Sequence, residues 1–391
     1  MSATEPEDLR HVERRLALIF PGFEPLSAMS QARRFLADLA DVAPLYRMTA
    51  DATEPRPIVV GDGLDGVEFS VHAQGAGWAT TTDVVIYGLA ALNRLYSRRN
   101  PLARVASGYR ALAELAVSGA LRGYVRSGRR FRFFFVYPFM AAVLVPVAAA
   151  IVAALADDWM PAGIAMALAA AAAIGIIWWL VRRLHLLLAL DLWSYTRDLA
   201  ERRHADVESI RAAAADDAAR RVSQTAAPEV LFCGHSMGAV IALAAAAAAR
   251  PRPDAGLGLL TGGGSIPQVG LDPAAAWLRD TIARLARSDV DWIDVQSKID
   301  VINFDKIDVS RDLGSAANTR LRVVPVRFRT QLTPKTYRAI RTDMFRIHRQ
   351  FVRAVEVRSH YSWHALICGP ERFAGVRMRG GLRETWEGRV E

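Results

Sequence analysis

Two uncharged apolar stretches, separated by only three residues, constrain the fold of this chain more than any other feature. The first covers residues 133–155, FFFVYPFMAAVLVPVAAAIVAAL, and the second covers residues 159–181, WMPAGIAMALAAAAAIGIIWWLV. As a helix, each stretch extends about 35 Å, which is enough to cross a hydrocarbon core of about 30 Å. Because only Ala156, Asp157 and Asp158 join them, the two helices must run antiparallel and return the chain to the side that it left.

The charges around this hairpin predict its orientation. Arginines gather on both outer flanks, and the positive-inside rule therefore places both flanks on the cytoplasmic side, with the Asp157–Asp158 turn on the far side. Aromatic residues near the ends of the spans match the interfacial positions that Trp and Tyr favour. The spans themselves contain no ionisable residue, which favours an anchor over a transport path. The flanking arginines are Arg122, Arg126, Arg129, Arg130, Arg132, Arg182 and Arg183, and the aromatics are Tyr137, Trp159, Trp178 and Trp179.

The composition and the N-terminal residues fit the same location. Hydrophobic residues make up 52% of the chain and charged residues 23%, a balance that leans toward membrane association. The first residues, MSATEPEDLRHVERR, are polar and lack the shape of a cleavable secretory signal. Two cysteines, Cys233 and Cys368, are too few for a disulfide framework. We therefore expect a multi-pass protein of the cell (inner) membrane with its globular part in the cytoplasm, although a buried alanine-rich hairpin of a soluble domain remains the alternative.

Strands alternate with helices on either side of the hairpin. This alternation predicts an α/β fold with a mostly parallel sheet and helices on both faces. The hairpin insertion, residues 122–190, then interrupts one domain whose halves are residues 1–121 and 191–391. The expected strands lie at 16–20, 66–72, 257–260, 291–296 and 321–328, with another after Pro228, and the expected helices lie at about 30–40, 83–97 and 185–221.

The pentapeptide GHSMG, residues 234–238, lies between an apolar strand and an alanine-rich helix. A serine on such a tight turn adopts strained backbone angles, and glycines two residues before and after it remove side chains that would clash there. The turn exposes the serine oxygen and aims backbone N–H groups at a developing oxyanion. This context predicts that Ser236 is a nucleophile.

The same residues resemble the α/β-hydrolase superfamily of serine esterases, lipases and thioesterases. Besides GHSMG, the stretch LALIFPGFEP at 16–25 resembles the strand and loop that supply the second oxyanion donor, with Pro21-Gly22 in place of the usual His-Gly. The resemblance implies the α/β-hydrolase fold, and it implies that the backbone N–H groups of Met237 and Phe23 form the oxyanion hole.

A serine nucleophile needs a histidine base and a carboxylate that orients it, and the family places them after the serine in the order acid, then histidine. Asp300, in SKIDVINF, resembles the family's Asp-x-Val loop and is the expected acid. His348, in FRIHRQFV, resembles the family's His-x-x-aromatic stretch with Phe351 as the aromatic, and it is the expected base. The alternatives that stay open are Asp291, Asp294, Asp305 and Asp308 for the acid, and His360, then His364, for the base.

The expected function is a membrane-anchored serine hydrolase that cleaves an ester or thioester of a lipid or acyl chain through an acyl-enzyme on Ser236. The alternatives are an acyltransferase that uses the same acyl-enzyme, or a non-catalytic membrane scaffold. We expect no cofactor and no metal, because His360 and His364 lack the acidic signature of a zinc helix and TGGGS at 261–265 lacks a phosphate-loop lysine. The net charge of +9 comes almost entirely from arginine, and the clusters at the spans favour membrane lipids over nucleic acid. The sequence does not determine the oligomeric state.

Overall fold

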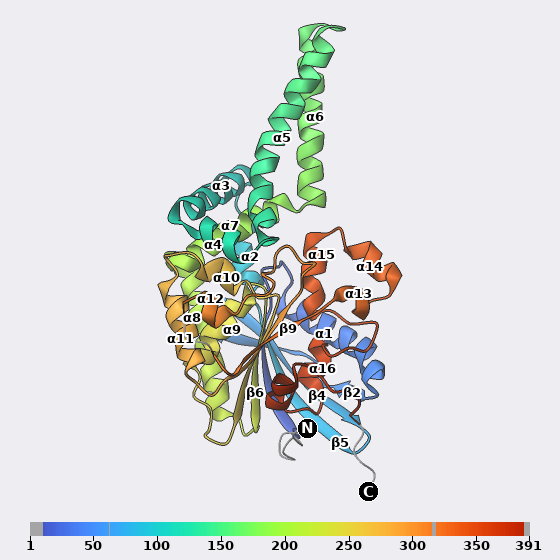
Figure 1. Cartoon of the computed structure of the whole chain (residues 1–391), viewed down its shortest axis with the longest axis vertical. Helices are drawn as coiled ribbons and strands as arrows, with labels where there is room; N and C mark the ends of the chain where they lie inside the picture. Colours follow the sequence, from blue (N-terminus) through green and yellow to red (C-terminus); the bar gives the residue numbers. More distant parts are fainter. Residues whose placement is uncertain (1–10, 62, 315–317, 387–391) are drawn as a thin grey trace.

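A nine-stranded, mostly parallel sheet forms the centre of the molecule in the computed structural model, which describes residues 11–61, 63–314 and 318–386 (Figure 1). The strands follow the order β2-β4-β5-β1-β6-β7-β8-β9, and β3 also pairs with β4. The strand bounds are β1 Arg14–Phe20, β2 Thr49–Ala52, β3 Arg56–Gly61, β4 Leu64–Gly75, β5 Trp78–Tyr87, β6 Glu229–His235, β7 Gly256–Gly262, β8 Asp291–Gln296 and β9 Leu321–Pro325.

The strands from β5 to β9 across the sheet are parallel, whereas β2, β3 and β4 form an antiparallel edge. In the middle, Ala17 of β1 is the register partner of both Val84 of β5 and Leu231 of β6. Every residue of β6 is buried, because helices cover both faces of the sheet. The carboxyl ends of parallel strands share one edge, so the loops after β1, β6, β7 and β8 come together there.

Helices cover both faces of the sheet, as the alternating pattern predicts. Buried side chains fall into two clusters, one of which contains Leu18 and Val230 and the other their strand neighbours Ala17 and Leu231. Helix α9, which is rich in alanine, lies against β6 and is buried from Gly238 to Ala246, because small side chains allow close packing. The helices are α1 Ala28–Val42, α2 Ala90–Ser97, α3 Pro101–Ser118, α4 Ala120–Ser127, α5 Phe131–Asp157, α6 Ala162–Arg183, α7 Leu186–Glu201, α8 Ala205–Gln224, α9 Gly238–Ala248, α10 Ile266–Gly270, α11 Ala276–Ala286, α12 Val309–Asp312, α13 Phe328–Gln331, α14 Pro334–Ile340, α15 Met344–Arg349, α16 Trp363–Cys368 and α17 Phe373–Arg379.

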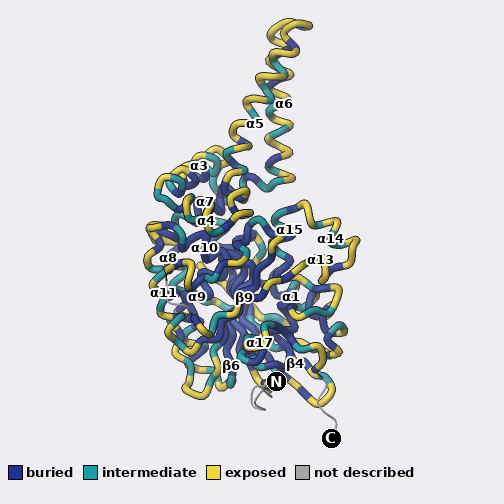
Figure 2. Tube along the Cα trace, viewed as in Figure 1, coloured by how far each residue is buried: buried dark blue, intermediate teal, exposed yellow. Residues whose placement is uncertain are grey.

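The two apolar stretches form a helical hairpin, α5 and α6, that projects from one end of the molecule (Figure 1). Both helices are long and apolar enough to span a membrane, and only 11% and 17% of their most apolar windows are buried (Figure 2). The hairpin is therefore not the buried core hairpin that a soluble domain would contain. The second helix begins at Ala162, three residues later than the sequence pattern predicts, because Pro161 stands at its N-cap.

The sequence pattern was wrong about several boundaries. The expected helix 83–97 is instead the end of β5 followed by α2, because Val84, Val85, Ile86 and Tyr87 are β-branched or aromatic residues that favour a strand. The expected helix 185–221 is divided into α7 and α8 at Arg202, which has a φ of 55°. The expected strand 321–328 ends at Pro325. The sequence pattern did not predict strands β2 and β3.

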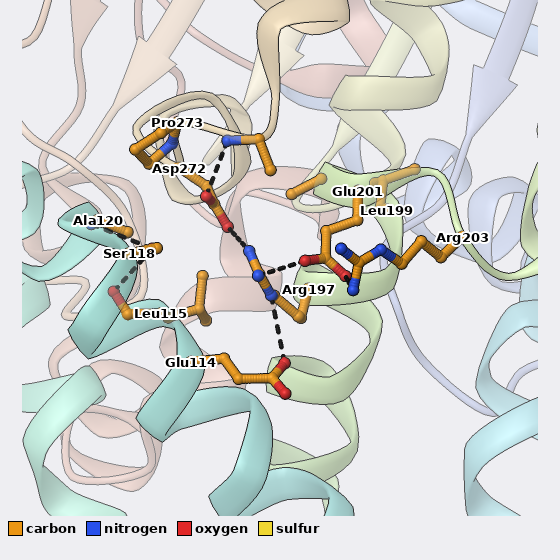
Figure 3. Close-up of polar contacts among 12 residues, drawn as sticks. Glu114, Leu115, Ser118, Ala120, Arg197, Leu199, Glu201, Arg203, Asp272 and Pro273 are labelled. Atoms are coloured by element: carbon orange, nitrogen blue, oxygen red, sulfur yellow. Dashed lines mark hydrogen bonds and ion pairs between the residues drawn. The ribbon is translucent and has the colours of Figure 1, made fainter.

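Arg197 of α7 links the helices near the hairpin to the sheet domain (Figure 3). Its guanidinium lies 2.7 Å from Asp272, 3.4 Å from Glu114 of α3, and also forms an ion pair with Glu201. Asp272 is fully buried and follows α10, the helix that comes directly after β7. This network fixes α3 and α7 above the edge of the sheet where the strand loops come together.

Candidate active site

Ser236 occupies a strained turn between β6 and α9. Its φ is 54°, in the left-handed region that non-glycine residues rarely adopt. A Cβ on Gly234 would lie 2.4 Å from the Cα atom of Ala239, and one on Gly238 would lie 2.1 Å from the Phe20 carbonyl oxygen. Both glycines are therefore required by close backbone approaches. The strained serine conformation and its two glycines match the turn that the sequence pattern predicts.

Asp300 and His348 form a buried pair. Nδ1–H of His348 donates a hydrogen bond of 2.6 Å to Oδ2 of Asp300, and the two residues are 4% and 1% exposed. Asp300 lies in the loop after β8, where its Oδ1 also accepts a hydrogen bond from the Ile302 amide, and His348 lies on α15. A proton on Nδ1 leaves a lone pair on Nε2, which is the tautomer that a general base requires.

The turn and the pair are neighbours at the carboxyl edge of the sheet. Nε2–H of His235 donates a 3.0 Å hydrogen bond to the backbone oxygen of His348, and the two imidazole rings are 5.0 Å apart. A Cβ on Gly263, in the loop after β7, would lie 3.3 Å from Cε1 of His348. That same loop also contacts the turn, because the Ser265 amide donates to the Ser236 carbonyl oxygen at 3.0 Å.

The serine oxygen and the imidazole are not hydrogen-bonded to each other in this structure. Among the described residues, Nε2 of His348 is buried without a hydrogen-bond partner, and Oγ of Ser236 lies 3.4 Å from Oγ of Ser265. Catalytic hydrogen bonds are often long without substrate and shorten when it binds. Ser236 is only 5% exposed.

The competing histidines lie elsewhere. His360 is exposed, and its Nε2–H donates to the Pro325 carbonyl oxygen at 3.2 Å. His364 is fully buried with its ring 4.8 Å from that of Phe35, and neither of its nitrogens has a hydrogen-bond partner in the described part of the chain. Only His348 of the three forms a hydrogen bond with Asp300.

The competing aspartates have other partners. Asp291 forms ion pairs with Arg377 and Arg320. Asp294 lies within β8 and accepts hydrogen bonds from Thr261 at 2.6 Å and Gln296 at 2.7 Å. Burial raises the pKa of the Asp294 carboxyl to about 6, which its two hydrogen bonds only partly offset. Asp308 caps α12, and Asp305 is half-buried in the same loop as Asp300.

The two residues expected to supply oxyanion donors lie beside Ser236. Met237 is the N-cap residue of α9, and Phe23 lies in the loop after β1. A Cβ on Gly22 would lie 3.0 Å from Cβ of Ser236, so this loop runs directly against the serine. Among the described residues, neither the Met237 nor the Phe23 amide donates a backbone hydrogen bond.

The sequence analysis did not predict the contacts of two residues at the site, His235 and Ser265. His235 holds the backbone of His348, and burial together with the neighbouring His348 lowers its pKa to about 3, so that it stays neutral. Ser265 contacts both the oxygen and the backbone of Ser236. The sequence signal for Ser265 is its place in TGGGS at the end of β7, because β7 is the parallel neighbour of β6, the strand that leads into Ser236.

Within the described residues, no group of three or more His, Cys, Asp or Glu side chains is arranged to hold a metal ion. The chain matches no family model, no curated protein and no solved structure.

Proposed function

We propose that this protein is a membrane-anchored serine hydrolase of the α/β-hydrolase fold that cleaves an ester or thioester. The observation that carries the proposal is the buried hydrogen bond of 2.6 Å between His348 and Asp300, next to Ser236 on a turn with a φ of 54°. A strained serine, a histidine with a free Nε2 and a carboxylate on Nδ1 are the three parts that nucleophilic acyl transfer requires.

In the proposed reaction, Oγ of Ser236 attacks the carbonyl carbon while Nε2 of His348 takes the hydroxyl proton. The Asp300 carboxylate stabilises the imidazolium that forms. The amides of Met237 and Phe23 donate hydrogen bonds to the oxyanion of the tetrahedral intermediate. The intermediate collapses when His348 returns the proton to the leaving alcohol or thiol, which gives the acyl-enzyme. Water, deprotonated by His348, then attacks the acyl carbon, and His348 returns the proton to Oγ of Ser236 as the acyl–Oγ bond breaks and the acid leaves.

The hairpin supports a membrane location and an acyl-chain substrate. Its helices α5 and α6 are long and apolar enough to cross a bilayer, and the flanking arginines favour a cytoplasmic site at the inner membrane. At its foot, the Phe131 ring of α5 stacks at 4.0 Å on Phe304, in the loop that holds Asp300. The Phe134 ring lies 6.3 Å from Phe345, on the helix that holds His348. A lipid ester in the adjacent leaflet would therefore lie close to the proposed catalytic residues.

A fluorophosphonate probe tests the nucleophile directly, because it forms a covalent bond with an activated serine. Membranes that contain the full-length protein should be labelled, and the Ser236→Ala variant should lose the label. Ser223→Ala is the matched control, since Ser223 is exposed on α8 and lies in another part of the chain. Equal labelling of Ser236→Ala and the unsubstituted protein would overturn the assignment. If the Ser236→Ala variant loses the label, product analysis with alcohol and water in competition would distinguish hydrolysis from acyl transfer.

A further inference from the structure

Helix α3 presents an apolar stripe on its outer side. Leu102 and Val117 are 82% and 88% exposed, and Ala106 and Ala113, which are also exposed, lie between them at helical spacing. Single exposed apolar residues are ordinary on soluble proteins, but a row of them along one helix face indicates a contact surface. Figure 2 shows α3 with exposed residues on its outer edge, at the foot of the hairpin.

The packing of α3 fixes which of its sides faces outward. A Cβ on Gly108 would lie 2.5 Å from Cβ of Leu190, so α3 and α7 are in close contact at this position. Four residues earlier, the guanidinium of Arg104 forms an ion pair of 2.7 Å with Asp191, whose side chain is 1% exposed. These two contacts prevent rotation of α3 about its axis. The stripe that contains Leu102 therefore cannot turn inward.

A hydrogen bond determines how far α3 lies along the hairpin. The Tyr109 hydroxyl donates to the Pro138 carbonyl oxygen at 2.7 Å, and its ring lies 6.2 Å from that of Phe139. Pro138 is five residues beyond Phe133, where the apolar stretch begins, which corresponds to about 8 Å along the helix. In-plane amphipathic helices insert roughly 5–10 Å into the boundary between headgroups and acyl chains. In Figure 1, α3 lies beside the lower part of α5, and its axis is transverse to that of α5.

We propose that α3 is an in-plane membrane helix whose apolar stripe contacts lipid in the same leaflet that α5 and α6 enter. This inference rests on the proposed membrane crossing of the hairpin. Arginines before and after the helix favour anionic lipids, because long cationic side chains can extend toward lipid phosphates at the membrane surface. These residues are Arg98 and Arg99, which precede α3, and Arg122 and Arg126, which follow it in α4.

The test places an environment-sensitive nitrobenzoxadiazole label on single introduced cysteines in the full-length protein. The native Cys233 and Cys368 are fully buried, and burial raises the pKa of both thiols, so neither should react. Leu102→Cys and Val117→Cys report on α3, and Leu144→Cys reports on the middle of the first span. Asp289→Cys, whose native side chain is fully exposed before β8, is the aqueous control.

The labelled proteins are reconstituted in vesicles of phosphatidylcholine and phosphatidylglycerol that contain lipids with a nitroxide quencher at acyl carbon 5 or 12. We expect fluorescence at positions 102 and 117 to be lost mainly with the shallow quencher, and at position 144 mainly with the deep one. Position 289 should be unaffected by either. The graded depth would show that α3 lies in the plane of the membrane.

Three other results would overturn the inference in different ways. If position 144 is quenched while 102 and 117 behave like 289, the hairpin crosses the bilayer but α3 remains in water. If 102 and 117 report an apolar environment but are not quenched, another protein chain covers the stripe and the inference is also wrong. If position 144 is not quenched either, the proposed membrane crossing itself fails.

Discussion

His348 donates a hydrogen bond of 2.6 Å to Asp300, although 48 residues separate them in the sequence. The carboxylate is held by the loop after β8, and the imidazole is held by α15, whose N-cap is Asp343. His185, which directly precedes α7 at the end of the hairpin, lies 3.5 Å from that capping carboxylate. The foot of the hairpin and the proposed catalytic pair therefore belong to one packed unit.

Replacement of Asp300 by Asn tests the role of the carboxylate. An amide can retain the shape of the loop but stabilises the other imidazole tautomer, so that Nε2 no longer accepts a proton. We expect turnover of a p-nitrophenyl ester to fall by about 10³- to 10⁴-fold. Asp305→Asn, in the same loop, is the control and should retain turnover. A similar loss in both variants would mean that the loop and not the carboxylate matters.

Replacement of Gly238 by Ala tests the close approach at the nucleophile turn. The new methyl group would lie 2.1 Å from the Phe20 and 2.2 Å from the Pro21 carbonyl oxygen, so the backbone must move. We expect a loss of roughly 3 kcal/mol or more in the free energy of unfolding, together with loss of probe labelling. Gly175→Ala in α6 is the matched control. A Cβ there has no atom within 4 Å, so thermal unfolding in detergent should show no destabilisation.

We expect replacement of Arg15 to lower the free energy of unfolding strongly. Its guanidinium is fully buried, lies 2.6 Å from Glu229 and donates to carbonyl oxygens of the segment that contains Ile367 and Glu371. Arg15→Met leaves the buried Glu229 without its cation, which should cost about 3–5 kcal/mol. Arg14→Met is the neighbouring control, because the Arg14–Asp83 pair is exposed and contributes at most about 1 kcal/mol. Chemical denaturation in detergent measures both, and equal effects would contradict the prediction.

We expect burial of His364 to cause part of the loss of folding stability at low pH. Burial lowers its pKa to about 3, so between this pH and about 6.5 the unfolded chain binds a proton that the folded chain does not. The neutral ring therefore contributes fully to the free energy of unfolding above the pKa that His364 has in the unfolded chain. This contribution falls by about 1.4 kcal/mol for each pH unit below that pKa. His364→Phe should flatten the fall in stability between pH 6.5 and 4. The exposed His360→Phe should leave it unchanged, and an unchanged slope in His364→Phe would disprove the prediction.

Sequence reasoning succeeded where a local pattern has one structural outcome. The hairpin follows from two uninterrupted apolar stretches and a short turn, and the structure contains both helices. The strand–turn–helix around Ser236 follows from an apolar run, two glycines and an alanine-rich run. It failed between Asp83 and Tyr87, where β5 forms, because pairing with β1 and β4 outweighs the weak helical periodicity of that stretch.

The sequence by itself determined the elements of this protein, namely the apolar hairpin, the alternation of strands and helices and the glycine-flanked Ser236. It could not decide between His348, His360 and His364, because a hydrogen bond depends on distances between segments that are far apart in the chain. Only the tertiary structure brings α15 against the loop after β8, which pairs His348 with Asp300 and leaves His364 in an apolar cluster with Phe35. It also decided which face of α3 is exposed, because that orientation results from the contact of Gly108 with α7 rather than from hydrophobic periodicity.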